Sequence, residues 1–194
     1  MSLVSTLKPK LHTARDVERL DAQGQRYELI RGELLPMSPT SGEHGRETMT
    51  IAAIIWNFVD EQNLGDVYAA ETGFLLTKKP DTVLAPDVAF VRRDRLTNIS
   101  TKGFADCVPD LVVETRSPSD SQRSVAAKLK RWIDFGVHIV IDLNPQGRTL
   151  TVYRPGCEPE TLGPDDTLHG YDVLPASLCP CLGFFGRLVF LSVK

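Results

Sequence analysis

The sequence predicts an α/β fold of the α+β type, with a mixed, mostly antiparallel central sheet flanked by helices. Short apolar runs rich in β-branched residues are typical of buried strands, and they occupy residues 83–91, 109–115 and 137–143. Apolar residues at helical spacing predict helices over residues 43–62 and 119–136. Strands and long helices therefore share one layered fold.

Composition is that of one globular domain covering residues 1–194, with 42% hydrophobic and 24% charged residues. A net charge of −3 argues against a general polyanion binder, whose domain is usually basic. Basic side chains do cluster in residues 92–95 and 116–131, where they either form a solvated face or receive a phosphate backbone. No apolar stretch approaches the ~18 residues of a membrane span, so we expect a cytoplasmic protein without a membrane partner.

The four cysteines do not follow a zinc-binding pattern. Cys179 and Cys181 are separated by a single residue, and no second pair of sulfur or histidine ligands lies at a suitable interval. We interpret all four as free thiols in a reducing compartment. They are Cys107, Cys157, Cys179 and Cys181.

An acid at the end of an apolar strand gives the first candidate for chemistry. Glu114 follows Leu-Val-Val and precedes a Ser-Pro break, so it lies at the carboxyl end of the predicted strand. The next helix has Ser119 as its expected N-cap and Gly136 at its end. Lys128 lies beside the apolar stripe of that helix and can lean over the sheet edge. The alternative is that Glu114 only ends a strand and Lys128 only reaches solvent.

A second acid lies in the preceding apolar strand. Asp87 follows Pro86 within residues 83–91, and an acid in such a strand is costly unless it is paired or bound to a cation. Two carboxylates suit Mg²⁺, and a nearby lysine can orient the attacking water and offset phosphate charge. These residue types predict metal-assisted phosphodiester hydrolysis.

At this point the chain resembles a known family, the Uma-two endonucleases, a branch of the PD-(D/E)xK restriction-endonuclease-like superfamily. The resemblance covers most of residues 20–175, which we take as the core, in the family's order, and includes the helix of His44. The matching stretches are YELIRGELLPMSP (27–39), ETGFLL (71–76), APDVAFV (85–91), PDLVVETRSPSDS (109–121), KLKRWIDFGV (128–137) and LNPQGRTLTVYRPG (143–156).

The resemblance implies a nuclease site on a restriction-endonuclease-like core. Asp87 and Glu114 would hold Mg²⁺ or Mn²⁺, and the superfamily lysine two residues after the glutamate is replaced by Arg116. Because arginine stays protonated, it cannot act as a general base. The resemblance therefore implies that Lys128 has taken the lysine role, while Arg116 contacts a substrate phosphate. The partner would be nucleic acid, most simply DNA, and cutting two strands would suit a homodimer.

Three further side chains are candidates for supporting roles. Glu71 lies on a strand predicted over residues 67–76, whose hairpin with residues 83–92 would bring it near Asp87 as a third acid. Glu47 either reaches the metal, as the first-helix glutamate does in many superfamily nucleases, or is a first-turn acid facing the helix dipole. His44 is equally consistent with substrate contact and with packing.

The remaining elements are short. We expect a helix over residues 13–22 capped by Thr13, a hairpin about Gly32, and a second hairpin over residues 137–154. Residues 93–108 are predicted to form a polar crossing loop, and the apolar residues 182–194 to pack on the body or on another subunit.

Two other functions remain open from the sequence. A non-catalytic nucleic-acid or protein-binding module on the same fold fits the low basicity and the missing lysine at Arg116. A carboxylate-pair hydrolase such as a glycosidase could use the two acids. The basic helix next to them would have no purpose with a neutral sugar.

Overall fold

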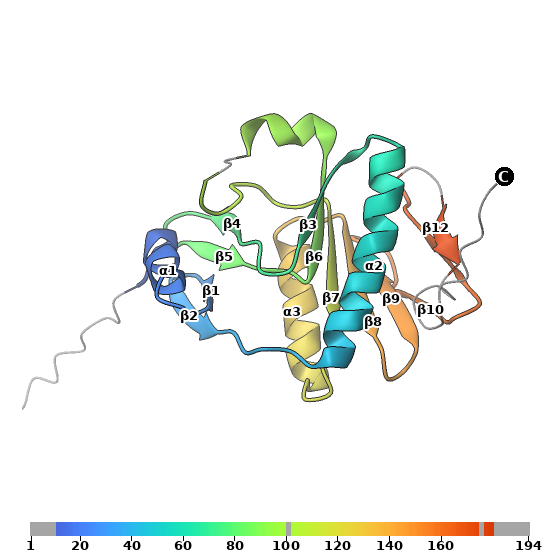
Figure 1. Ribbon diagram of the computed structural model, residues 1–194, viewed down its shortest axis with the longest axis horizontal. Coiled ribbons are helices and arrows are strands. Elements are labelled where there is room, and N and C mark those ends of the chain that lie inside the picture. Colours follow the sequence, from blue (N-terminus) through green and yellow to red (C-terminus); the bar gives the residue numbers. More distant parts are fainter. Residues whose placement is uncertain (1–10, 100–101, 175–176, 181–194) are drawn as a thin grey trace, which may run out of the picture.

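A computed structural model describes residues 11–99, 102–174 and 177–180. Within them the chain forms three α-helices, a 3₁₀-helix and twelve strands, so both helices and strands are present as predicted (Figure 1). In chain order the elements are α1 (Ala14–Asp21), β1 (Tyr27–Ile30), β2 (Glu33–Pro36), α2 (Gly42–Glu61), β3 (Gly65–Ala69), β4 (Phe74–Thr77), β5 (Thr82–Leu84), β6 (Val88–Arg92), η1 (Arg93–Asn98), β7 (Leu111–Thr115), α3 (Gln122–Asp134), β8 (Ile139–Asn144), β9 (Thr149–Tyr153), β10 (Glu160–Leu162), β11 (Thr167–His169) and β12 (Ser177–Pro180).

The central sheet has six strands in the order β10-β9-β8-β7-β6-β3. Only β7 and β8 run parallel, and the other neighbours in this sheet are antiparallel, so the predicted mixed, mostly antiparallel sheet is confirmed. A four-stranded sheet, β2-β1-β5-β4, lies beside it with α1, at the left of Figure 1. The parallel β7–β8 pair needs a crossover, and α3 supplies it.

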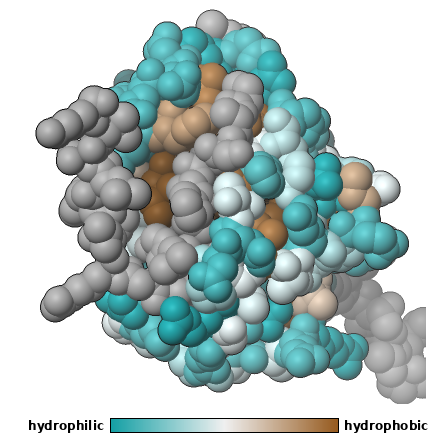
Figure 2. All heavy atoms as spheres, turned by 90° about the vertical axis from the view of Figure 1, so that its right-hand side faces the viewer, coloured by the Kyte–Doolittle hydropathy of each residue, from teal (hydrophilic) through white to brown (hydrophobic). Residues whose placement is uncertain are grey.

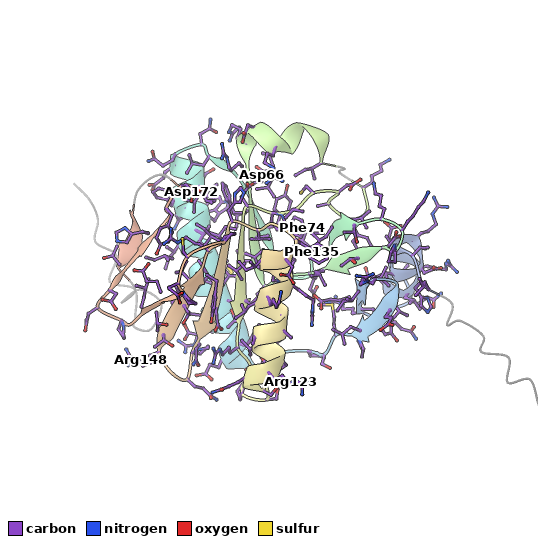
Figure 3. The ribbon with its side chains drawn as sticks, turned by 180° about the vertical axis from the view of Figure 1, so that it is seen from behind. Asp66, Phe74, Arg123, Phe135, Arg148 and Asp172 are labelled. Atoms are coloured by element: carbon purple, nitrogen blue, oxygen red, sulfur yellow. The ribbon has the colours of Figure 1, made fainter. Side chains whose placement is uncertain are left out.

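Two helices cover opposite faces of the six-stranded sheet. Figure 1 shows α2 in front of the sheet, and Figure 3, from behind, shows α3 on the other face, with Arg123 and Phe135 near its two ends. The core follows the alternation of β7: Leu111 and Val113 pack in one cluster with α2, whereas Val112 packs in another with α3. Glu114 shares the parity of Val112, so it lies on the α3 side of the sheet.

The segments predicted to form one hairpin over residues 67–92 do pair antiparallel, but the pairing is divided between the two sheets. β3 pairs with β6 in the central sheet, whereas β4 pairs with β5 in the smaller one. The chain leaves the strand conformation at Ala85, and Pro86 provides no N–H for a ladder there. Asp87 consequently lies in a short connection before β6 and not inside a strand.

Ser119, the N-cap predicted for α3, is wrong by two residues. Asp120 Oδ2 accepts the Ser117 N–H at 2.7 Å, which closes a turn before the helix begins. Ser121 is the N-cap, and its Oγ accepts the Ser124 N–H at 3.1 Å. Gly136 ends the helix as predicted, with a φ of 90° that suits glycine.

The other predicted elements are present with small shifts. Thr13 caps α1 in a capping box, and Ser41 caps α2 by accepting the His44 N–H at 3.2 Å. The predicted loop over residues 93–108 begins as the 3₁₀-helix η1. Both predicted short hairpins form, β1–β2 and β8–β9.

The small β11–β12 sheet lies at the end of the molecule drawn at the right of Figure 1. Figure 2 shows that end, where apolar side chains gather toward the middle within a hydrophilic surround. Cys107 and Cys157 are free thiols. The side chain of Cys179, Cys181 and the segment 182–194 lie outside the described residues. In the described part of the chain, no helix combines the length and apolar character that crossing a membrane requires.

Candidate active site

Glu114 is a buried carboxylate at the carboxyl end of β7, held between two side chains of α3. Its Oε1 accepts a 2.6 Å hydrogen bond from Trp132 Nε1, and Lys128 Nζ lies 2.5 Å from its Oε2. Lys128 and Trp132 are four residues apart on one face of the helix, so both reach the same carboxylate. The lysine approaches Oε2 without a well-aligned hydrogen bond, and this buried oxygen keeps unused acceptor capacity.

Burial determines the protonation of this pair. It raises the pKa of Glu114 from 4.5 to about 8, and Asp87 adds to this while Lys128 and Trp132 oppose it. Burial opposes the charge of Lys128, but Glu114 and Asp87 together raise its pKa above the ordinary value. Lys128 therefore stays protonated at neutral pH. Its side chain is 38% exposed, so part of it faces the solvent.

Asp87 is tied to the residue that follows Glu114. Its Oδ2 accepts the Thr115 N–H at 2.7 Å, across the gap between the start of β6 and the end of β7. The same oxygen lies 3.2 Å from His44 Nε2 of α2. The connection that interrupts the predicted strand thus places Asp87 beside Glu114, and its charge acts on both Glu114 and Lys128.

His44 and Thr48 reach this edge from the first turns of α2. The hydrogen bond with Asp87 raises the pKa of His44 above its ordinary value, although burial opposes the change. Thr48 Oγ1 donates to Thr115 Oγ1 at 2.8 Å, so α2 is anchored to the end of β7. His44 is 7% exposed and contacts Asp87, which gives it a polar role beyond packing.

Glu28 is another buried acid near the site, and the sequence interpretation missed it. It lies on β1, is 6% exposed, and accepts the Ala85 N–H at 3.1 Å with its Oε1. It also contributes to the raised pKa of Lys128. Glu28 therefore holds the backbone just before Asp87. The signal was present, since Glu28 is an acid inside an apolar strand.

Arg116 is paired with the neighbouring strand. Its Nε and Nη2 donate to the two carboxylate oxygens of Asp142 at 2.8 and 2.5 Å. Such a bidentate contact is among the strong hydrogen bonds of proteins. Asp142 is directly opposite Glu114 in the parallel β7–β8 register, so Arg116 remains next to the acid pair with 31% of its side chain exposed.

Replacing Arg116 with alanine is expected to lower the free energy of unfolding by roughly 3 kcal/mol, because Asp142 would become a buried carboxylate without its partner. Asp142 is only 1% exposed. Urea unfolding measures the change, with Arg123→Ala on the exposed face of α3 as control. Equal stability of the two variants would contradict a structural role for the Arg116–Asp142 pair.

The two accessory acids of the sequence analysis are placed differently from the expectation. Glu71 lies in the turn after β3, not on a strand, and forms an ion pair with Arg26. Glu47 is in the second turn of α2, so the interpretation as a first-turn acid is wrong; Glu43 has that place. Glu47 is 5% exposed, and Arg46 Nη2 lies 2.5 Å from its Oε1. Within the described residues, no three His, Cys, Asp or Glu side chains are grouped as a metal site.

Each of the two acids lines a cavity of its own. The smaller one, about 80 Å³, lies against α3 and includes Glu114, Arg116 and Lys128 in its lining. The larger one, about 290 Å³, lies against α2 and includes His44, Asp87 and Glu71. The smaller cavity is lined by the charged groups that suit an anion and its counter-ion.

Comparison with known proteins gives one family and one fold. Residues 14–182 match the family Uma2, described as "Putative restriction endonuclease". Among solved structures, a "putative nuclease belonging to DUF820" from Anabaena variabilis ATCC 29413 superposes with a TM-score of 0.71 at 20% identity, covering 89% of this chain and 98% of that one. No curated protein matches the sequence. The likeness to the solved structure shows a shared fold, and the match over residues 14–182 shows that the chain belongs to the Uma2 family.

Proposed function

We propose that this chain is a metal-dependent endonuclease that hydrolyses phosphodiester bonds of DNA, with Asp87, Glu114 and Lys128 as its reacting groups. The observation that carries the proposal is the 2.5 Å approach of Lys128 Nζ to the buried Glu114 Oε2, beside Asp87. A buried carboxylate with a second, partly buried carboxylate and a lysine beside it is costly to maintain. Such an arrangement is typical of a functional site.

The donor atoms fit a hard divalent cation. Mg²⁺ commonly binds one or two carboxylates and retains several waters, so two acids suffice without a third protein ligand. Glu114 Oε2 has unused acceptor capacity, and the charge of Asp87 acts on the same carboxyl group. Mg²⁺ or Mn²⁺ bound by Asp87 and Glu114 would supply Lewis-acid activation of water and charge neutralisation at the phosphate.

Lys128 would hold the reacting groups in place. Because its pKa is raised, it donates hydrogen bonds and does not act as a base at neutral pH. Its ammonium would position the attacking water and offset negative charge on the phosphate in the transition state. Trp132 fixes the other oxygen of Glu114 through a 2.6 Å hydrogen bond, so the carboxylate cannot rotate away.

Arg116 supplies positive charge at the rim of the same small cavity. Its Nε and one terminal nitrogen donate hydrogen bonds to Asp142. Because a guanidinium has five N–H donors, others remain for a second partner. The exposed part of the side chain would contact a phosphate oxygen of the DNA backbone. Asp142 would then act as a positioning residue for this contact.

A non-catalytic nucleic-acid or protein-binding module on the same fold is the second candidate. It is favoured by the net charge of −3 and by Arg116 in the place of the superfamily lysine. Such a module would retain DNA without cutting it.

A plasmid-nicking assay separates the two candidates. Supercoiled DNA is incubated with the protein in Mg²⁺, in Mn²⁺ and in EDTA. The nuclease proposal predicts nicked circles in either metal and none in EDTA, with linear product if two copies act on opposite strands. Retention of DNA without cleavage in both metals would favour the binding module.

A further inference from the structure

The larger cavity is positioned to receive a part of the substrate that carries no charge. It measures about 290 Å³, at the lower end of the ~300–1,000 Å³ of small-molecule sites. Its walls come from the first three turns of α2, the loop before that helix, the turn after β3 and the connection that carries Asp87. Apolar side chains form much of the lining, among them Met37, Pro39, Met49 and Pro86.

Charge excludes a phosphate from this cavity. Among the described residues no lysine or arginine lines it, whereas the carboxylates of Asp87 and Glu71 do. Glu71 already pairs with Arg26 and Asp87 with His44. A phosphate there would meet two carboxylates and no lysine or arginine of the described lining. A neutral, flat group with hydrogen-bond donors would instead contact the apolar walls and donate to the acids.

We propose that this cavity binds one unstacked nucleobase of the DNA strand that is cut. The inference rests on the proposed nuclease function, because it needs a phosphate at Asp87, Glu114 and Lys128. Asp87 and His44 line the cavity and also belong to the candidate active site. A nucleotide whose phosphate is held at Asp87 would therefore have its base beside the cavity. Bases outside a stack are commonly held between apolar or aromatic side chains.

The proposal has a consequence for the substrate class. A base inside a duplex must be unstacked and unpaired before it can enter a pocket, whereas a single strand presents its bases freely. The chain is therefore expected to bind and cut single-stranded or distorted DNA in preference to regular duplex.

Gly45 allows the cavity to be filled with little disturbance of the fold. It lies on the exposed side of α2 and lines the cavity, and a Cβ built on it meets no atom within 4 Å. Phenylalanine at this position is a better helix former than glycine, and its ring would occupy the space proposed for the base. Gly42 is the matched control, because its Cβ is equally unobstructed on the same helix but does not line the cavity.

The test measures affinity for two short single-stranded oligonucleotides, one normal and one made of abasic nucleotides, by fluorescence anisotropy with Ca²⁺ in place of Mg²⁺. Gly45→Phe is expected to weaken binding of the normal strand on the order of ten-fold, the size of one base-stacking contact, and to leave the abasic strand unaffected. Gly42→Phe is expected to change neither affinity.

The outcomes separate this proposal from the nuclease proposal. One outcome is that the wild type cuts plasmid while Gly45→Phe and Gly42→Phe bind the normal and abasic strands with the same affinities. That result would contradict the base pocket and leave the nuclease proposal intact. Equal weakening for normal and abasic strands would also overturn the pocket, since the added ring would then obstruct the backbone. A wild type that neither binds nor cuts DNA would overturn both proposals.

A second pair of variants covers the case that Gly45→Phe fails to fold. Met49 and Trp56 are both exposed apolar side chains of α2, at 64% and 53%, but only Met49 lines the cavity. Met49→Ala is expected to weaken the normal strand several-fold without affecting the abasic strand, and Trp56→Ala to change neither. The same result for both variants would contradict the pocket.

Discussion

Replacing Glu114 with glutamine is expected to lower the rate of Mg²⁺-dependent DNA cleavage by on the order of 10³-fold, the scale found for loss of one transition-state electrostatic contact. The amide has the size of the carboxylate and can still accept the Trp132 Nε1–H, so the local packing persists. The change removes one of the two carboxylates that are proposed to hold the metal ion. Cleavage rate at saturating Mg²⁺ measures the effect, and Glu61→Gln at the exposed end of α2 serves as control.

The same variant also changes how stability depends on pH. The pKa of Glu114 is raised to about 8 in the folded protein and is near 4.5 in an unfolded chain, so the folded state binds one proton more between these values. The free energy of unfolding of the ion-free wild type therefore falls as pH rises from about 4.5 to 8, by a few kcal/mol. Glu114→Gln should lack this decline in urea unfolding experiments in EDTA. An equal decline in both proteins would show that another group causes it.

Replacing Lys128 with methionine is expected to slow cleavage by roughly 10²- to 10⁴-fold, because the ammonium that faces Glu114 and the phosphate is lost. Without Lys128, the main group that lowers the pKa of Glu114 disappears, so that pKa should rise further. The residual activity should consequently need a higher pH than the wild type. The measurement is cleavage rate as a function of pH in Mg²⁺.

Lys130→Met is the matched control for this change. Lys130 is on the same helix, two residues away, and its ammonium pairs with Asp134 on the exposed face at 2.6 Å. Its loss should leave the cleavage rate and its pH profile unchanged. If Lys128→Met and Lys130→Met lose the same activity, the effect is a general loss of positive charge and the role assigned to Lys128 is wrong.

Periodicity was sufficient to predict the surroundings of Glu114. The parity of residues 111–115 predicts the side of β7 on which Glu114 lies, and helical spacing predicts which lysine of α3 leans toward it. Both are local rules, and the structure has Lys128 Nζ 2.5 Å from Glu114 Oε2. The buried apolar side chains of α2 were predictable for the same reason, because they follow helical spacing.

Contacts between distant segments could not be predicted in this way. The Arg116–Asp142 pair depends on the β7–β8 register, and the Thr48–Thr115 hydrogen bond depends on how α2 crosses the sheet. The break at Pro86 divides a continuous apolar run between two sheets, which periodicity does not distinguish from one strand. At the start of α3, Ser119 was predicted as the cap, but the Ser117–Asp120 turn delays the helix so that Ser121 is the N-cap.

The contact that Glu71 makes could not be predicted from local rules either. Its ion pair with Arg26, a residue just before β1, joins segments that no local rule relates. The proposed metal site therefore consists of Asp87 and Glu114, and a role of Glu71 as a third acid stays a prediction.

Asp87 and Glu114 together are proposed to bind one divalent cation. Titration of the protein with Mn²⁺, followed by electron paramagnetic resonance of the free ion, measures this without any nucleic acid. One Mn²⁺ site per chain is expected in the wild type, with its affinity weakened at least ten-fold in Asp87→Asn and in Glu114→Gln. Unchanged Mn²⁺ affinity in both variants, or no binding by the wild type, would contradict it.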